Sequence, residues 1–376
     1  MKIGIITFHF AHNQGAVLQC YALQKFLKKL GHDAEVIDYC PSYHTNRYSS
    51  KRNPFIMASD TLKKNENLKI QKRLYKAARS FAKGIYISVT GVYKLREKKF
   101  GDFAKRNFNL SRKYKTLKEL QKNPPECDVY ISGSDQLWNP ELVNNGFDGA
   151  YFLDFGADDV KRITYAVSLK EHYTLEEKDE IQMYCKNIDV ISSREKSETL
   201  DDLLGENYTV CIDPTLLLEK EDFADAENEI EEKEPYIFVY GFETTSNIVE
   251  AVNVISKETG FRVVNGSPDR IKLVNVTNLC NYGPGEFLSY MKNADFVITN
   301  SFHGTAFSLI YNKKFVTVAH TTRGRRMTEL LAKVGLSDRI WADCCDWKKE
   351  IDYMAAEQKI KELKNYAAEY LAKSLK

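Results

Sequence analysis

Short apolar runs alternate along this chain with longer stretches in which apolar residues recur every three or four positions. The pattern predicts a strand over residues 3–7, a helix over 16–30 and a second strand over 34–38. A helix between two strands is the repeating unit of a parallel sheet covered by helices. The first forty residues therefore predict the beginning of a doubly wound α/β sheet.

The alternation continues along the chain and restarts once. Further strands are predicted over 128–132, 163–167, 189–192 and 208–212, with a helix over 175–187. After an acidic stretch, 219–234, strands are predicted over 236–240, 261–264, 271–274, 296–299 and 315–318, and helices over 247–259 and 283–293. The restart predicts two Rossmann-like domains, 1–225 and 235–345, and a C-terminal helix within 346–376 that packs back on the first domain.

Composition supports two globular cores. The chain has 376 residues, of which 43% are hydrophobic and 28% charged. Its eight cysteines form no CxxC pair and lie mostly in apolar runs, which favours reduced thiols over disulfides or a metal site. The adjacent Cys344 and Cys345 are better explained as loop residues than as a metal or redox pair. The opening apolar run is too short for a secretory signal, so we expect a cytoplasmic protein.

Residues 44–120 are strongly basic. They contain 21 Lys and Arg against 5 Asp and Glu, although the whole chain has a net charge of only +2. Apolar residues recur among these charges at roughly helical spacing, which predicts an insertion of amphipathic helices. The charge has three explanations: solvated helix faces, contact with anionic lipid head groups, or a pyrophosphate-bearing substrate. Nucleic acid is not an expected partner, because no binding motif accompanies the charge.

Two loops after predicted strands of the first domain carry candidate binding groups. The first contains His9, His12, Asn13 and Gly15 at a helix start, where amide groups favour an anion or a polar sugar, although a cap and turn would use the same residues. The second loop follows Gly133 and combines amides, a carboxylate and an indole, as sugar sites do; its residues are Ser134, Asp135, Gln136, Trp138 and Asn139. A turn capped by Asp135 is the alternative for the second loop.

The stretch 295–318 places a histidine where a ligand is expected. A strand, 296–299, ends in the sequence NSFHG, and a helical pattern follows, so His303 lies in the turn. Arg194 begins a predicted helix, which suggests a bound anion or a salt bridge to Glu195 or Glu198. Three further arginines near another helix start also suit an anion; they are Arg323, Arg325 and Arg326.

Six segments, in this order, resemble the polysaccharide pyruvyl transferase family: 13–39, 130–139 (YISGSDQLWN), 165–168 (YAVS), 191–195 (ISSRE), 212–218 (IDPTLLL) and 300–316 (NSFHGTAFSLIYNKKFV). The resemblance implies a glycosyltransferase-B-like fold of two Rossmann-like domains around a cleft. It implies transfer of the pyruvyl unit of phosphoenolpyruvate to a sugar, as a cyclic ketal, in bacterial capsule or exopolysaccharide synthesis. Phosphoenolpyruvate would be a co-substrate, and no cofactor is expected.

The resemblance also implies residue roles. His303 and Asp135 would be catalytic. The donor would be bound by Arg194, Ser301, Gly304, Arg323, Arg325 and Arg326. The acceptor, a sugar or a lipid-linked oligosaccharide, would be bound by Asn13, Gly15, Ser134, Gln136, Trp138 and Asn139, with no metal involved. A lipid-linked acceptor would bring residues 44–120 to the inner membrane face.

One position departs from the family pattern. Ser301 stands where many family members have an arginine, so a later arginine would have to supply that charge. Two other functions remain open on the same fold. They are a nucleotide-sugar-dependent glycosyltransferase, which the absence of an acid over 305–310 disfavours, and a non-catalytic carbohydrate-binding relative.

Overall fold

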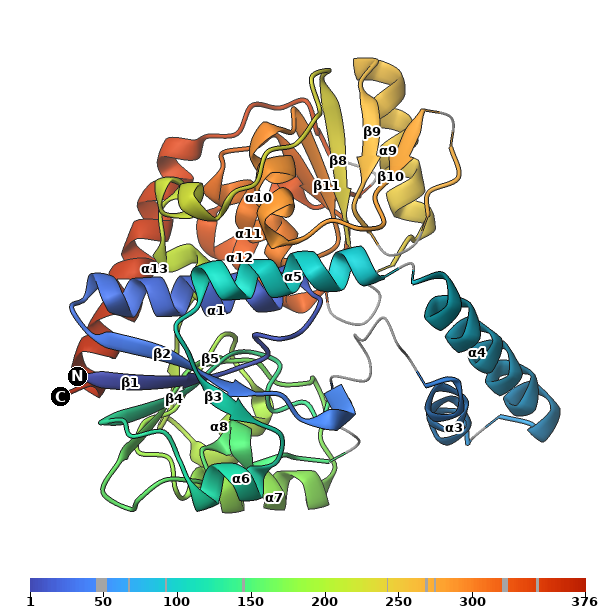
Figure 1. Ribbon diagram of the computed structural model, residues 1–376. Helices are drawn as coiled ribbons and strands as arrows, with labels where there is room; N and C mark the ends of the chain where they lie inside the picture. Colours follow the sequence, from blue (N-terminus) through green and yellow to red (C-terminus); the bar gives the residue numbers. More distant parts are fainter. Residues whose placement is uncertain are drawn as a thin grey trace.

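The chain contains two parallel sheets with helices on their faces and between them (Figure 1). The computed structural model describes residues 1–44, 53–66, 68–91, 93–143, 146–241, 243–267, 270–273, 275–319, 324–342 and 345–376. The prediction of an α/β protein with two Rossmann-like sheets is confirmed.

The first sheet has seven parallel strands in the order β3-β2-β1-β4-β5-β6-β7. The chain moves outward from β1 through β2 to β3 and then returns to β4 on the other side of β1. This reversal leaves a crevice beyond the carboxyl ends of β1 and β4, where open α/β sheets bind ligands. The strands are β1 Lys2–Ile6, β2 Asp33–Tyr39, β3 Leu110–Tyr114, β4 Val129–Asp135, β5 Lys161–Val167, β6 Ser192–Ser193 and β7 Thr209–Val210.

The second sheet repeats this arrangement with five parallel strands in the order β10-β9-β8-β11-β12. Its reversal lies between β8 and β11, so a second crevice opens beyond their carboxyl ends. The strands are β8 Tyr236–Tyr240, β9 Arg262–Asn265, β10 Val276–Asn278, β11 Phe296–Thr299 and β12 Phe315–Thr317. Around the sheet lie α9 Ser246–Thr259, α10 Pro284–Asn293, α11 Phe302–Ile310, α12 Arg325–Val334 and the 3-10 turn η4 Ser337–Arg339.

Helix α1, Gln14–Lys29, lies between the two sheets (Figure 1). Its side chains are buried on almost every side, and one apolar core continues from Ile3 of the first sheet through Leu23 to Phe238 of the second. Across this layer the Tyr240 hydroxyl donates to Oε1 of Gln14 at 3.4 Å. The start of α1, which follows β1, is thereby held against the end of β8.

The other elements of the first half cover its sheet or connect its strands. They are α6 Leu117–Lys122, α7 Leu175–Cys185, α8 Glu198–Leu204 and the 3-10 turns η1 Gly149–Phe152, η2 Pro214–Leu217 and η3 Lys220–Ala226. The acidic stretch 219–234, whose sequence suits a linker or a solvated helix, begins with η3. Its Phe223 is fully buried in the core, so this part is not a solvated segment.

The described part of the basic segment contains the helices α3, α4 and α5, as its amphipathic pattern predicts, and also the edge strand β3. Helices α3, Pro54–Lys64, and α4, Ile70–Thr90, pack on each other and project as a hairpin from the body (Figure 1). Helix α5, Lys94–Asn107, returns to the body and lies beside α10. Among the helices that the structure describes, none is long and apolar enough to cross a membrane.

The last helix, α13, spans Tyr353–Ser374 and contacts elements of both halves of the chain. It packs on α12 and on η2, and the Tyr370 hydroxyl donates to the Thr164 carbonyl of β5 at 2.8 Å. Leu371 of this helix is fully buried. The helix therefore ties the second half of the chain to the first sheet.

Two strand predictions were wrong in detail, and one strand was missed. No strand forms over 271–273, and β10 begins at Val276, beyond a stretch where Asn275 has a positive φ of 63°. The sequence pattern also missed β3, because this edge strand has an exposed polar middle. The strand expected over 189–192 is reduced to β6, since only Ser192 and Ser193 pair regularly with their neighbours.

Candidate active site

His303 lies in the first turn of α11, directly above the end of β11. Buried hydroxyls hold this turn: Thr299 Oγ1 accepts the Ser301 N–H at 3.0 Å, and Ser301 Oγ accepts the Gly304 N–H at 3.4 Å. A Cβ on Gly304 would lie 2.0 Å from Thr299 Oγ1, so only glycine allows the helix to start this close to the strand. Ser301 and Gly304 therefore shape the turn that presents His303.

Gly15 of α1 lies very close to His303, from the other half of the chain. A Cβ added to Gly15 would lie 2.1 Å from Nδ1 of His303, well inside any van der Waals contact. Asn13 caps the same helix, accepting the Ala16 N–H at 3.2 Å. The two crevices thus meet where the imidazole of His303 lies against the first turn of α1. Asn13 caps that turn, and Gly15 leaves space in it for the imidazole.

Asp213 faces the opposite side of the imidazole. Its Oδ2 lies 3.6 Å from Nε2 of His303 and accepts a hydrogen bond from Nη1 of Arg194 at 2.8 Å. Its Oδ1 accepts the N–H and hydroxyl of Thr215 at 3.0 and 2.7 Å. Burial by itself would raise the pKa of Asp213, but His303, Arg194 and Thr215 together hold it well below its ordinary value.

Asp213 was missing from the predicted site, although it lies in the IDPTLLL segment that resembles the family. The available signal was a carboxylate just after a strand and before a proline turn. The same position also suits a residue that caps the following turn, and Asp213 is the N-cap of η2.

Arg194 is buried among carboxylates. Besides Asp213, it lies 3.5 Å from Glu195 and 3.8 Å from Asp135, and its guanidinium stacks 4.5 Å from the ring centre of Phe302. Burial lowers the pKa of Arg194, but these three carboxylates raise it above the usual value. The salt bridge to Glu195 is therefore present, and the charge of Arg194 is compensated by the protein itself.

A cleft of about 510 Å³ opens beside this cluster. Its walls come from the loops after β4, β5 and β6 and from the start of α12; they include Gln136, Asn139, Lys170, Glu195, Lys196, Arg325 and Arg326. A smaller recess shares Glu195 and Arg326 with the cleft and reaches Arg194 and Asp213. The cleft therefore leads from exposed polar groups to the buried cluster.

Arg326 connects the two halves across the cleft. Its Nη1 donates to Oγ of Ser168 at 3.2 Å, and that hydroxyl donates in turn to Glu195 at 2.5 Å. Arg325 instead pairs along α12 with Glu329 at 2.7 Å on the surface. Arg323 lies outside the described residues.

The loop after β4 divides into cleft residues and core residues. Asp135 has a left-handed φ of 79°, and after it Gln136 and Asn139 turn toward the cleft. Trp138 is fully buried, stacks on Phe152 and donates to the Tyr151 carbonyl, so its prediction as a sugar platform is wrong. Ser134 is likewise buried and donates to the Ala166 carbonyl, so it is not an acceptor contact. The sequence pattern assigned both residues to the sugar site because they stand among polar residues that follow a strand, and this pattern does not show which side chains enter the core.

Several buried polar atoms at this site lack a hydrogen-bond partner in the part of the chain that the structure describes. They are Nε2 of Gln14, Nε of Arg194, Oε2 of Glu195 and Nε2 of His303. Buried polar groups are usually hydrogen-bonded, and exceptions gather where a ligand or water is bound. Their concentration around His303 marks this cluster as the candidate active site.

A family model described as polysaccharide pyruvyl transferase matches residues 13–322, which include every element of this site up to α11. The chain belongs to the polysaccharide pyruvyl transferase family. The match contains His303, Asp213, Arg194, Asp135 and Gly15 and ends before Arg325 and Arg326. A search of curated proteins found no significant match.

Solved structures resemble the chain over nearly its full length but at low identity. A UDP-GlcNAc 2-epimerase from Methanocaldococcus jannaschii shares 12% identity with a TM-score of 0.48, covering 97% of this chain and 93% of its own. The S. aureus MnaA-UDP co-structure shares 12% with a TM-score of 0.47, covering 96% and 87%. E. coli heptosyltransferase WaaC with ADP shares 10% with a TM-score of 0.40, covering 96% and 100%.

Proposed function

We propose that this family member transfers the pyruvyl unit of phosphoenolpyruvate to two hydroxyls of a sugar, as a cyclic ketal, in bacterial surface polysaccharide synthesis. The supporting observation is the contact of His303 with Gly15, Asp213 and the Arg194 cluster at the junction of two sheet crevices. Family membership supports pyruvyl transfer, and the position of the cluster fits a two-substrate reaction.

The reaction needs an acid, a place for two anionic groups and a sugar site. Protonation of the phosphoenolpyruvate methylene creates a cationic centre at C2, which a sugar hydroxyl attacks. Phosphate then leaves, and a second hydroxyl of the same sugar closes the ketal ring. Each hydroxyl loses its proton during these steps, so a base is required after the acid has acted.

His303 suits the proton transfers. An imidazole can both donate and accept a proton near neutral pH, and Nε2 of His303 has no full hydrogen bond in the described structure. Asp213, 3.6 Å away, stabilises the ring when it carries a positive charge. Asp135, 3.8 Å from Arg194, is the candidate base for the sugar hydroxyl.

The anionic donor requires a cation that faces the cleft. Arg194 has three carboxylate neighbours, so we assign it to holding Asp213 and stacking on Phe302, below the donor. Arg326 lines the cleft from the start of α12 and would take the place of the family arginine that Ser301 replaces. Arg326 would bind the phosphate or carboxylate of phosphoenolpyruvate, because a guanidinium fits either group with two hydrogen bonds.

The acceptor would lie against Gln136 and Asn139. Side-chain amides donate and accept hydrogen bonds, as sugar hydroxyls require, and both residues line the cleft.

The decisive experiment incubates the full-length protein with phosphoenolpyruvate and a panel of acceptors. The panel includes free sugars, nucleotide sugars and lipid-linked saccharides, with phosphate release and product mass as readouts. We expect one phosphate released per ketal formed, and neither without acceptor. Glycosyl transfer from a nucleotide sugar, with phosphoenolpyruvate unused, would instead establish the glycosyltransferase alternative.

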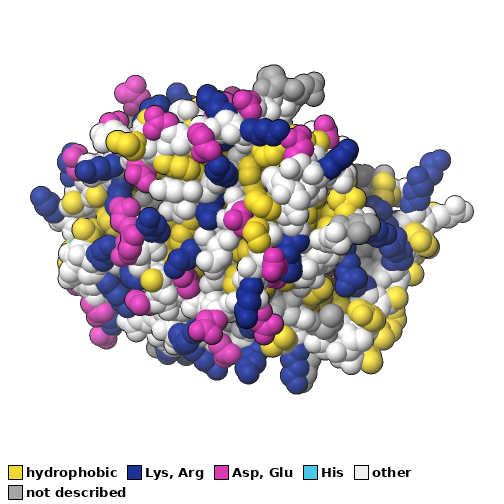
Figure 2. Space-filling view, turned by 90° about the horizontal axis from the view of Figure 1, so that it is seen from above, with side chains coloured by type: hydrophobic (Ala, Val, Ile, Leu, Met, Phe, Trp, Pro, Cys, Tyr) yellow, Lys and Arg dark blue, Asp and Glu magenta, His cyan; other side chains and the backbone are white. Residues whose placement is uncertain are grey.

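We also propose that the α3–α4 hairpin contacts an anionic membrane surface that carries a lipid-linked acceptor. Residues 54–90 contain eight Lys and Arg against two Asp and Glu. Large apolar side chains are exposed on the same two helices, among them Phe55 at 72% and Val89 at 81%. At the end where the hairpin projects, on the right of Figure 2, hydrophobic side chains lie beside Lys and Arg. A basic amphipathic surface of this kind binds anionic interfaces.

Liposome flotation tests this contact. Vesicles with anionic lipid should carry the protein upward at low salt, and a Phe55→Ser, Val89→Ser variant should bind less. A Met354→Ser variant, which removes an exposed apolar side chain of α13, is the matched control. Equal binding to neutral vesicles would exclude the electrostatic contact.

A further inference from the structure

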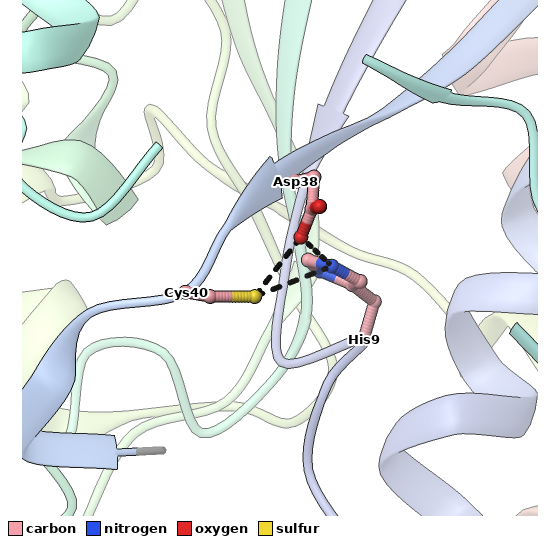
Figure 3. A group of neighbouring side chains, drawn as sticks. All are labelled: His9, Asp38 and Cys40. Atoms are coloured by element: carbon pink, nitrogen blue, oxygen red, sulfur yellow. Dashed lines mark hydrogen bonds and ion pairs between the residues drawn. The ribbon is translucent and has the colours of Figure 1, made fainter. Parts of the chain in front are cut away.

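Three side chains of types that bind metals converge near the loop between β1 and α1, outside the cluster described above (Figure 3). His9 comes from the loop after β1, and Asp38 and Cys40 come from the end of the neighbouring strand β2. Asp38 and Cys40 are two positions apart, so they project from the same face. Oδ1 of Asp38 lies 3.2 Å from Nε2 of His9 and 2.9 Å from Sγ of Cys40, and these last two atoms are 4.0 Å apart.

The imidazole of His9 is aimed at this point by a second contact. Its Nδ1 lies 3.2 Å from the carbonyl oxygen of Thr7. Histidines that bind metals usually direct their other nitrogen at a carbonyl or carboxylate, which orients the ring. His9 and Cys40 are almost fully buried, at 3% and 5% exposure, so the donors face one another inside the protein.

The contact with Thr7 determines which nitrogen of His9 faces the other two side chains. A carbonyl oxygen only accepts a hydrogen bond, so Nδ1 is the nitrogen that donates to Thr7. Nε2 is therefore the ring nitrogen that faces Asp38 and Cys40, at 3.2 and 4.0 Å.

A nucleophilic thiol explains the arrangement less well. In a Cys-His-Asp relay, the carboxylate and the thiol occupy different nitrogens of the ring. Here both face Nε2, and Sγ of Cys40 is directed at Asp38 at 2.9 Å. Three donor atoms that share one focus are the arrangement of a metal site.

We propose that His9 Nε2, Asp38 Oδ1 and Cys40 Sγ bind one divalent transition metal ion, most favourably zinc. Nitrogen, oxygen and thiolate are ligands of tetrahedral zinc, whose bond lengths place neighbouring donors roughly 3.3–3.7 Å apart. The three observed separations, from 2.9 to 4.0 Å, require only small side-chain adjustments to reach these values. From the sequence, the absence of a CxxC pair disfavoured a metal site. The proposed ligands are not close together in the sequence, because His9 follows β1 whereas Asp38 and Cys40 lie at the end of β2.

The bound ion would fasten the loop between β1 and α1 to the edge strand β2. That loop leads through Asn13 to Gly15, which rests on His303. The metal would therefore stabilise the start of α1 without touching substrate. The inference does not depend on the identity of the donor or acceptor.

Cobalt substitution tests the site in the full-length, reduced protein after removal of any histidine tag. Metal-free protein should bind one equivalent of Co²⁺ and develop the near-ultraviolet charge-transfer band of a cobalt–thiolate bond, together with the strong visible bands of tetrahedral cobalt. One equivalent of Zn²⁺ should remove both. Zinc should also raise the melting temperature of the wild-type protein, because a ligand that binds only the folded state stabilises it.

Variants assign the ligands. Cys40→Ser should lose the charge-transfer band, and His9→Gln should weaken cobalt binding at least about tenfold, because it removes a first ligand. Cys280→Ser, which changes an exposed thiol elsewhere, should retain both the band and the affinity. If Cys40→Ser does not fold, His9→Gln and Asp38→Asn decide the question. A wild-type protein without the band, or equal bands in wild type and Cys40→Ser, would overturn the proposal.

Discussion

The buried cluster around His303 and the open cleft beside it both contain arginines and carboxylates, which are enclosed in the cluster and more exposed in the cleft. In the cluster, Arg194 and Asp213 are enclosed and neutralise each other at 2.8 Å. In the cleft, Arg325 pairs at the surface, and Arg326 spans two domains through a hydroxyl. Charges that are buried must be paired by the protein, whereas charges at the rim of a cleft stay partly in contact with solvent and can also face a ligand. We therefore expect changes in the cluster to affect folding and chemistry, and changes in the cleft to affect binding.

Asp213→Asn should have the largest effect. It removes the partner of a buried guanidinium and of His303, so we expect a loss of about 3–5 kcal/mol in the free energy of unfolding and of most activity. Urea unfolding followed by circular dichroism measures the first, and phosphate release the second. Asp202→Asn, which breaks the exposed pair with Lys178, is the control and should cost less than about 1 kcal/mol. Equal losses in the two variants would contradict the comparison.

Gly15→Ala should strongly lower kcat while preserving the fold. The new Cβ would meet Nδ1 of His303 at 2.1 Å, so the imidazole must move. A displaced catalytic group lowers kcat by roughly 100-fold. Gly101→Ala, at a helical glycine with open space around it, should leave kcat unchanged. Normal turnover by Gly15→Ala would show that the position of His303 is not needed.

Arg326→Ala should weaken donor use with little change in stability. Loss of one charge-assisted contact to an anion corresponds to roughly a tenfold fall in kcat/KM for phosphoenolpyruvate. Arg325→Ala, which removes a surface pair on the same helix, is the matched control and should change kcat/KM less than twofold. If the two variants behave alike, Arg326 does not contact the donor.

The smallest expected effect is an acid-dependent loss of stability from Asp213. Its folded pKa lies below the ordinary value of 3.8, so the carboxylate stabilises the protein fully above that pH and loses this contribution as pH falls toward the folded pKa. One such group adds a slope of up to about 1.4 kcal/mol per pH unit in that window. Unfolding titrations of wild type and Asp213→Asn, from pH 5 downward, should show a shallower slope in the variant. Parallel slopes would mean that Asp213 does not titrate abnormally.

The sequence predicted the local features that depend on neighbouring residues. Apolar periodicity located β8 and β11 at their observed bounds, and the motif NSFHG placed His303 at the start of α11. The sequence did not show which residues of the loop after β4 enter the core and which line the cleft. Trp138 and Gln136 are two positions apart, yet one enters the core and the other lines the cleft, because the chain turns after β4 and does not continue as a strand.

Most of the strands and helices in their order, the two Rossmann-like units and the membership of a family could be predicted from the sequence alone, because each of these follows from patterns of nearby residues. Only the tertiary structure decided which distant residues meet: Gly15 with His303, Asp213 with Arg194, and His9 with Cys40. Parallel strands bring loops to a common edge according to their order in the sheet. That order depends on long-range packing, which no local pattern specifies.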